Sequence, residues 1–250
     1  MKSSLNWKSI HKESSGRMQS ACVDELIKCF KEQADAKAAM PMMKYMRDQF
    51  EFLGLPNPVR TGLTKPWVKK FDGLTEAQLI QVVEELWSLP EREYQYAALS
   101  LLEKYKKNSS AGHIDLLEKM IISKSWWDTV DTIASHLVGA FFLRYPELIS
   151  PYTERWIQSD NMWLQRSALL YQLTYKKQTD QERLFSYILL CKDSDEFFIR
   201  KAIGWTLREL SKSDEQAVIK FLQQHKLSPL SHREALKVIK RTEHMSRSNP

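Results

Sequence analysis

The chain has 250 residues, of which 43% are hydrophobic and 27% are charged, and 37 basic side chains face 31 acidic ones. This balance excludes a disordered chain and a membrane-embedded one. Only 7 residues are glycine, well below the usual share of roughly 7%, which disfavours glycine-rich phosphate loops and hairpin-rich β folds. The composition therefore favours helices.

The basic excess is confined to the C-terminal third. Residues 161–250 hold 16 Lys and Arg against 10 Asp and Glu, whereas residues 1–160 hold 21 of each. A polyanionic partner would suit this bias, and solvated lysine-rich helix faces would also explain it. The start of the chain has no apolar signal region, and no apolar run approaches the roughly 20 residues of a membrane span. We therefore expect a cytoplasmic protein that does not bind membranes.

Along the chain, apolar residues recur at helical spacing, for example in the stretch 79–87, and no sustained period-two alternation occurs. Helix starts are predicted where Ser or Thr is followed three residues later by Asp, Glu or Gln, which can form a capping box. We predict a helix start at each of four such pairs: Thr75 with Gln78, Ser125 with Asp128, Ser213 with Gln216, and Ser231 with Glu234. Short joints containing proline at 88–90, 145–146 and 227–229 predict helix ends. The sequence predicts an all-α fold.

An internal repeat refines this prediction. The pattern Arg-x-Ala-(Leu/Ile) occurs at 166–169, 200–203 and 233–236, at spacings of 34 and 33 residues. A repeat that holds about two helices predicts a superhelical array with a concave face. We expect one such domain over 21–242, with capping helices at about 21–60 and mobile tails at 1–20 and 243–250.

The repeat register also singles out one acidic residue. Asp131 takes the place that Arg166, Arg200 and Arg233 hold in the other repeats. If these positions share one face, a single carboxylate lies within a row of arginines. A chance substitution at a loosely kept repeat position would explain the same pattern.

The segment around two adjacent tryptophans is the most unusual part of the chain. Trp126 and Trp127 point about 100° apart on a helix, so only one faces the core easily, and we expect this to be Trp126. Trp127 and Asp131 are four residues apart and share a helix face. Asp128 has a sufficient role in capping with Ser125. Asp131 has no such local role and is the candidate catalytic group.

Other pairs of an aromatic and a basic residue recur in neighbouring repeats, namely Trp163 with Arg166 and Trp205 with Arg208. Tryptophan, arginine and one aspartate on a concave face suit the binding of phosphates and of a sugar or cationic group. Core packing explains each tryptophan taken singly. The sequence has no zinc-protease, paired-cysteine, Walker or dinucleotide motif, so we expect no metal and no cofactor.

Four motifs together carry a family resemblance. They are Leu89–Glu93, Lys124–Asp131, Trp163–Arg166, and Lys201–Trp205 with Leu207–Glu209. In this order and spacing, the chain from about Met43 to Ile239 closely resembles the AlkD-type bacterial DNA alkylation repair glycosylases. The resemblance implies a superhelix of HEAT-like repeats whose concave face holds duplex DNA. It also implies excision of positively charged alkylpurines such as 3-methyladenine and 7-methylguanine, without base flipping.

The resemblance assigns roles to individual positions. It places the catalytic aspartate at Asp131, the sugar-contacting tryptophans at Trp127 and Trp205, and the central phosphate-binding arginine at Arg166. Further DNA-binding positions are Tyr45, Arg60 and Arg208, and the repeat register adds Arg200. Two positions depart from the family pattern, because Thr61 replaces an expected arginine and Thr174 an expected lysine. Both departures would weaken binding to the DNA backbone.

The predicted chemistry needs few groups. An N3- or N7-alkylated purine already carries a positive charge and leaves as a neutral base, so one carboxylate suffices to stabilise the cationic sugar and position water. We expect a monomeric bacterial enzyme that acts on the nucleoid without an obligate protein partner. The alternative is a non-catalytic helical-repeat module that binds DNA structure or serves as a protein scaffold, which would release no base.

Overall fold

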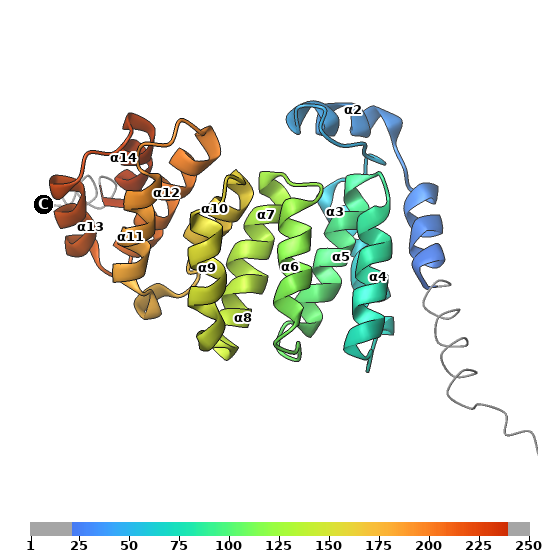
Figure 1. Cartoon of the computed structure of the whole chain (residues 1–250). Coiled ribbons are helices and arrows are strands. Elements are labelled where there is room, and N and C mark those ends of the chain that lie inside the picture. Colours follow the sequence, from blue (N-terminus) through green and yellow to red (C-terminus); the bar gives the residue numbers. More distant parts are fainter. Residues whose placement is uncertain (1–21, 240–250) are drawn as a thin grey trace, which may run out of the picture. The chain divides into compact units, whose positions relative to one another are not determined.

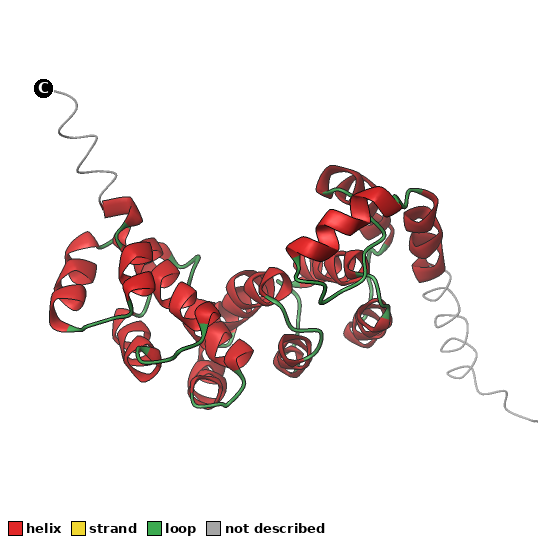
Figure 2. Cartoon of the chain, turned by 90° about the horizontal axis from the view of Figure 1, so that it is seen from above, coloured by secondary structure: helices red, strands yellow, loops and turns green. Residues whose placement is uncertain are grey.

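The computed structural model describes residues 22–239, which form two compact units within 1–110 and 111–250. The described residues form helices and loops without a β-strand (Figure 2), apart from an isolated bridge between Glu51 and Glu91. The prediction of an all-α fold is therefore confirmed. The tails predicted at 1–20 and 243–250 lie outside the described residues. Within 22–239, no helix is long and apolar enough to cross a membrane.

The first unit is built from helices that pack through regularly spaced apolar residues. Residues 22–32 are helical, and the following helices are α2 (Ala36–Tyr45), α3 (Asn57–Lys70), α4 (Glu76–Ser88) and α5 (Arg92–Tyr105). Thr75 and Gln78 form the predicted capping box at the start of α4. The apolar stripe of α4 is buried against α5. Helix α3 also packs against α5.

The motif at Leu89–Glu93 has a structural role in this unit. Glu93 is fully buried, and its carboxylate accepts hydrogen bonds from the backbone N–H groups of Leu53, Gly54 and Leu55 at 3.1, 2.9 and 3.1 Å. The neighbouring Arg92 is also fully buried and stacks on the ring of Phe50 at 3.8 Å. The motif therefore fixes the loop that joins α2 to α3, because a buried carboxylate must find donors.

The second unit continues as a series of short helices (Figure 1). They are α6 (His113–Ile122), α7 (Trp127–Thr132), the π-helix η1 (Ile133–Val138), α8 (Gly139–Arg144), the 3₁₀ turn η2 (Pro146–Leu148), α9 (Ile149–Ile157), α10 (Met162–Leu170), the 3₁₀ turn η3 (Lys176–Gln178), α11 (Gln181–Cys191), α12 (Phe197–Ser211), α13 (Glu215–Gln224) and α14 (Pro229–Ala235). Helix α10 packs on α9 and α12, and α12 packs on α13 and α14.

The predicted sequence repeat corresponds to one pair of helices. Arg166 lies on α10, Arg200 on α12 and Arg233 on α14, and each of these helices follows a partner helix, α9, α11 or α13. Each pair buries apolar residues against the next, as in other helical-repeat proteins. The prediction of stacked helix pairs is therefore confirmed in this unit.

Three of the four predicted capping boxes are wrong, because each hydroxyl has another partner. Ser125 donates to the carbonyl of Ile121 at 2.6 Å, and α7 begins after Trp126 without a side-chain cap. Ser213 donates to Leu210, and Asp214 caps α13 in its place. Ser231 lies inside α14 and donates to the carbonyl of Arg200 at 2.9 Å, while Ser228 caps that helix.

Candidate functional site

The centre of the candidate site is a bidentate ion pair between neighbouring repeats. Arg166 donates from Nε to Oδ1 of Asp131 at 2.7 Å, and from the Nη2 group to Oδ2 at 2.9 Å. The side chains are 5% and 15% exposed, respectively. Asp131 lies on α7 and Arg166 on α10, and these helices pack together. The repeat register therefore brings the exceptional carboxylate against the arginine of the next repeat.

A third bond and an aromatic cluster hold Arg166 in place. Its Nη1 group donates to the backbone carbonyl of Phe198, at the start of α12. The Phe198 ring packs against Trp126 and Trp163 with centroid separations of 5.2 and 5.0 Å, and those two tryptophans are 5.8 Å apart. Trp126 is in the extended conformation that precedes α7, and its buried indole N–H has no partner among the described residues.

The surroundings of Asp131 shift its titration. Burial raises the pKa of the carboxyl group above its ordinary value, whereas the hydrogen bonds and charge of Arg166 act to lower it, and Asp128 raises it further. The guanidinium supplies the positive charge that an ionised carboxylate needs in a largely buried place. The pair can therefore present a fixed negative charge at the partly exposed carboxylate.

A π-helix begins two residues after Asp131, and the next repeat supports it. In η1, the hydroxyl of Ser135 donates to the carbonyl of Asp131 at 2.6 Å. From the loop after α10, Thr174 donates to the carbonyl of Ser135 at 3.3 Å, and Tyr175 donates to that of Gly139 at 2.7 Å. Gly139 also permits this approach, since a Cβ there would lie 2.5 Å from the carbonyl oxygen of Tyr171. π-Helices are frequent at functional sites.

The two tryptophans predicted to contact the sugar lie on different helices of this unit. Trp127 is the first residue of α7, one turn before Asp131, and Trp205 lies in the middle of α12. Both side chains are half-buried, so each leaves part of its ring accessible. Their role in binding the sugar stays a prediction.

The other predicted DNA-binding arginines of this unit have acidic partners. Arg200 donates from Nε to the carbonyl of Ser194 at 2.7 Å and pairs with Asp195. Arg208 pairs with Glu234 of α14 at 3.3 Å.

Glu234 forms ion pairs with several basic side chains. It is buried, and besides Arg208 it also accepts from Lys201 at 2.9 Å and from Lys237 at 2.7 Å. Three basic side chains thus gather around one carboxylate, which leaves the cluster with a net positive charge.

The remaining two predicted residues belong to the first unit. Tyr45, at the end of α2, is 70% exposed. Arg60 of α3 donates to the side chain of Asn57 at 2.7 Å and lies over the ring of Tyr96 at 4.1 Å. Tyr45 and Arg60 both line a cavity of about 460 Å³ whose other walls include Met42.

Phe198 binds Arg166 and Glu234 binds the predicted Arg208, although the sequence patterns assigned no site role to either residue. Glu234 could have been found, since it follows Arg233 in a repeat motif, but its place three residues after Ser231 suggested a cap instead. Phe198 acts through its backbone carbonyl, for which a sequence carries no signal. Within residues 22–239, no group of three His, Cys, Asp or Glu side chains is arranged to hold a metal ion.

Comparisons with known proteins agree with this architecture. A family model described as DNA alkylation repair enzyme matches residues 26–239. A solved structure described as a predicted DNA alkylation repair enzyme from Enterococcus faecalis is 33% identical, with a TM-score of 0.77, and the match covers 82% of this chain and 95% of that one.

Two structures from Streptococcus mutans share the fold at lower identity. AlkD2 is 15% identical and the protein smu.31 is 16% identical, each with a TM-score of 0.56. Both matches cover 70% of this chain, and they cover 87% and 90% of the other chains. A comparison with curated proteins gives no match. With a family model that spans most of its length, this chain belongs to the DNA alkylation repair enzyme family.

Proposed function

We propose that the protein is a DNA glycosylase that hydrolyses the N-glycosidic bond of positively charged alkylpurines in duplex DNA. The observation that carries the proposal is the Asp131 carboxylate, which is partly exposed and held by two hydrogen bonds from Arg166. Membership of the alkylation repair family supports the substrate class. The lesions are 3-methyladenine and 7-methylguanine, as the sequence resemblance implies.

The reaction follows from the charge of the lesion. When the bond between C1′ and the purine nitrogen breaks, its electron pair goes to the purine, which becomes neutral and needs no general acid. The deoxyribose then carries positive charge, which the fixed carboxylate of Asp131 stabilises. Water attacks C1′ from the side of this carboxylate, which orients the water and accepts its proton as the new C1′–O bond forms and leaves a hydroxyl group on C1′.

In this proposal, Trp127 and Trp205 provide ring faces for the deoxyribose. A cationic group over an aromatic face is stabilised by about 0.5–2 kcal/mol. Both rings are partly accessible in the structure. The contact favours the sugar as its positive charge develops, because the interaction is stronger with the cation than with the neutral sugar.

Arg166 also has a structural role that does not depend on contact with a DNA phosphate. All three of its nitrogen groups donate to protein acceptors, two on Asp131 and one on Phe198. These bonds fix the orientation of the carboxylate and favour its ionised form. Recognition then rests on the charge and lability of the lesion and on backbone contacts, with no need for reading base edges or flipping the base.

The proposal is tested by base release from duplex DNA that contains 7-methylguanine. We expect Asp131→Asn to slow release by about 100-fold to 1,000-fold, because the variant lacks the fixed charge at the developing cation. Glu154→Gln, which removes a carboxylate at an exposed position on α9, is the matched control and should keep most of the activity. Fluorescence anisotropy with the same duplex should show that both variants still bind.

Two outcomes contradict the proposal. If wild-type protein binds the duplex and releases no base, the protein is a non-catalytic DNA-binding module. If Asp131→Asn releases base as fast as wild type, the carboxylate has no catalytic role.

A further inference from the structure

The helix that carries Asp131 changes its hydrogen-bond spacing soon after this residue. The backbone N–H of Ile133 bonds to the carbonyl of Thr129, four residues earlier. The N–H of Gly139 instead bonds to the carbonyl of Ala134, five residues earlier. This wider spacing defines a π-helix, which is a rare form and occurs mostly as a single turn inside an α-helix. The surrounding structure therefore has to stabilise it.

Three carbonyl groups of this segment accept hydrogen bonds from hydroxyl groups. They belong to Asp131, Ser135 and Gly139, which follow one another at intervals of about one helical turn. Ser135 donates to Asp131 at 2.6 Å, Thr174 donates to Ser135 at 3.3 Å, and Tyr175 donates to Gly139 at 2.7 Å. Two of the three donors come from the loop after α10, so this loop ties the π-helix to the next repeat.

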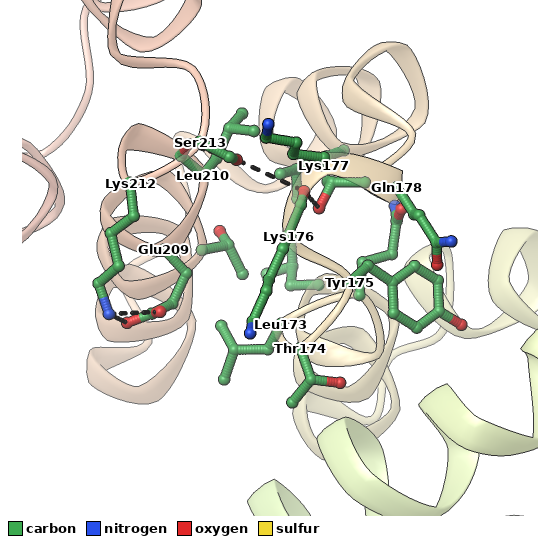
Figure 3. A pocket seen from close by; sticks show the side chains of 15 residues that line it. Leu173, Thr174, Tyr175, Lys176, Lys177, Gln178, Glu209, Leu210, Lys212 and Ser213 are labelled. Atoms are coloured by element: carbon green, nitrogen blue, oxygen red, sulfur yellow. Dashed lines mark hydrogen bonds and ion pairs between the residues drawn. The ribbon is translucent and has the colours of Figure 1, made fainter.

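The two loop residues are directed toward the π-helix. Both line a cavity of about 700 Å³ beside α12, and their hydroxyl groups point away from Glu209 of that helix (Figure 3). Tyr175 is 9% exposed, and its ring packs edge-on against that of Tyr171 with a centroid separation of 5.9 Å. Burial raises the pKa of the Tyr175 phenol, so the hydroxyl group keeps its proton and stays a donor.

The same repeat also holds the side chain of Asp131. Arg166 lies on α10 and donates to both carboxylate oxygens, and the loop with Thr174 and Tyr175 follows this helix. The repeat therefore acts on Asp131 at two places, directly at its carboxylate and indirectly at its backbone. The ion pair alone allows the two side chains to move together, whereas a second point of support fixes the position of the carboxylate in the site.

We infer that Thr174 and Tyr175 are positioning residues for Asp131, because their hydroxyl groups hold the π-helix that fixes its backbone. This inference rests on the proposed glycosylase function and adds to it two residues that act through another group. A displacement of about 1 Å in an active site can cost about 100-fold in rate. The hydroxyl groups therefore affect the chemical step more than the affinity for DNA.

The first test compares Tyr175→Phe with Tyr187→Phe. Tyr187 is the matched control, since it is also buried and its hydroxyl group shares a hydrogen bond of 2.7 Å with Thr153 of α9. We expect Tyr175→Phe to slow the single-turnover release of 7-methylguanine about tenfold and to keep the Kd for the duplex within about twofold of wild type. Tyr187→Phe should release base at the wild-type rate.

Thr174 provides a second test with a conservative variant. Thr174→Val removes the hydroxyl group and should slow release, though less than Tyr175→Phe, because the hydrogen bond of Thr174 is longer. Thr174→Ser keeps the hydroxyl group and should release base at the wild-type rate. Hydrogen–deuterium exchange of residues 127–139 should be faster in Tyr175→Phe and Thr174→Val than in Tyr187→Phe, and this measurement does not depend on activity.

Two results would overturn the inference while wild-type protein releases base. The first is wild-type release by both Tyr175→Phe and Thr174→Val, which would show that the loop does not position the catalyst. The second is an equal loss of rate in Tyr175→Phe and Tyr187→Phe, which would show a general effect of losing a buried hydroxyl group. An absence of release by wild-type protein would instead contradict the proposed function itself.

Discussion

Two opposing effects act on the pKa of the Asp131 carboxyl group. Burial favours its neutral form, and the two hydrogen bonds from Arg166 favour its charged form. Removing the arginine would leave the carboxyl group largely buried without its counter-charge. The pair therefore couples the protonation of the candidate catalyst to a side chain of the next repeat.

This coupling predicts a pH profile. Because burial raises the pKa of Asp131, base release should fall on acidification at a pH above the ordinary aspartate value of about 3.9. Arg166→Gln removes the interactions that lower the pKa while burial remains, so the fall should begin at higher pH. Arg166→Lys keeps the charge and should lie between the two.

The measurement is the initial rate of 7-methylguanine release from duplex DNA as a function of pH. The midpoint of the acid limb is independent of the absolute rate, so a slower variant still reports it. Identical midpoints in wild type and Arg166→Gln would show that the arginine does not control the titration of Asp131.

The two positions that depart from the family pattern have structural partners in this chain. Thr174 donates to the carbonyl of Ser135 in the π-helix at 3.3 Å, and Thr61 donates to the side chain of Asn57 at 3.2 Å. Thr174 thus supports the segment that follows Asp131. A residue that lacks the expected positive charge can still contribute to the site through its hydroxyl group.

At the scale of elements, the contact between α12 and α14 depends on close approach at a glycine. A Cβ at Gly204 would lie 2.4 Å from Cβ of Glu234 and 2.8 Å from the carbonyl oxygen of Ser231. This closeness lets Glu234 reach Lys201 and Arg208 on α12. Lys201 and Gly204 belong to the same family motif, and both contribute to the contact between these two helices.

The charges between α12 and α14 predict how stability depends on pH. Burial alone would raise the pKa of Glu234, but hydrogen bonds from Lys237 and Lys201 lower it to about 2. Since this value lies below the unfolded-state pKa of about 4.3, the stabilisation is complete above that pH and is lost as the pH falls toward about 2. The difference corresponds to about 3 kcal/mol at neutral pH.

Urea denaturation at several pH values measures this contribution. Glu234→Gln should lower the free energy of unfolding at neutral pH and flatten its decline between about pH 5 and about pH 2. Glu196→Gln, an exposed position at the start of α12 without a side-chain cap bond, is the control. A variant with the same pH dependence as wild type would show that Glu234 is not held in its charged form.

At the scale of the whole molecule, predicted DNA-binding residues occur in both units, with Tyr45 and Arg60 in the first and Arg166, Arg200 and Arg208 in the second. The net charge of residues 1–160 is zero and that of residues 161–250 is positive, since 16 basic side chains face 10 acidic ones. Binding to phosphates releases counterions, so the salt dependence of the affinity reports how many phosphates the protein neutralises.

We therefore expect Arg60→Ala and Arg208→Ala each to reduce the slope of log affinity against log salt by about 0.9, because each variant neutralises one phosphate fewer. The double variant should show about twice this reduction, because the two residues lie in different units and act independently. The measurement is duplex binding by anisotropy across a salt series. An unchanged slope in either single variant would remove that residue from the DNA interface.

Much of the fold could be predicted from the sequence because the signals are local or periodic. The apolar spacing of 79–87 predicts the buried stripe of α4, and the repeated Arg-x-Ala motif predicts the helix pairs α9–α10, α11–α12 and α13–α14. The capping prediction is correct only at Thr75, because the hydroxyl groups of Ser125, Ser213 and Ser231 each bind a backbone carbonyl instead.

The sequence by itself determined the all-helical repeat, the exceptional carboxylate at Asp131 and the family. Only the tertiary structure decided that Arg166 binds Asp131 and Phe198, and that Glu234 binds three basic side chains. Most of these interactions join residues about 30 positions apart. Their geometry depends on how one repeat packs on the next, and the periodicity of either repeat alone does not fix that packing.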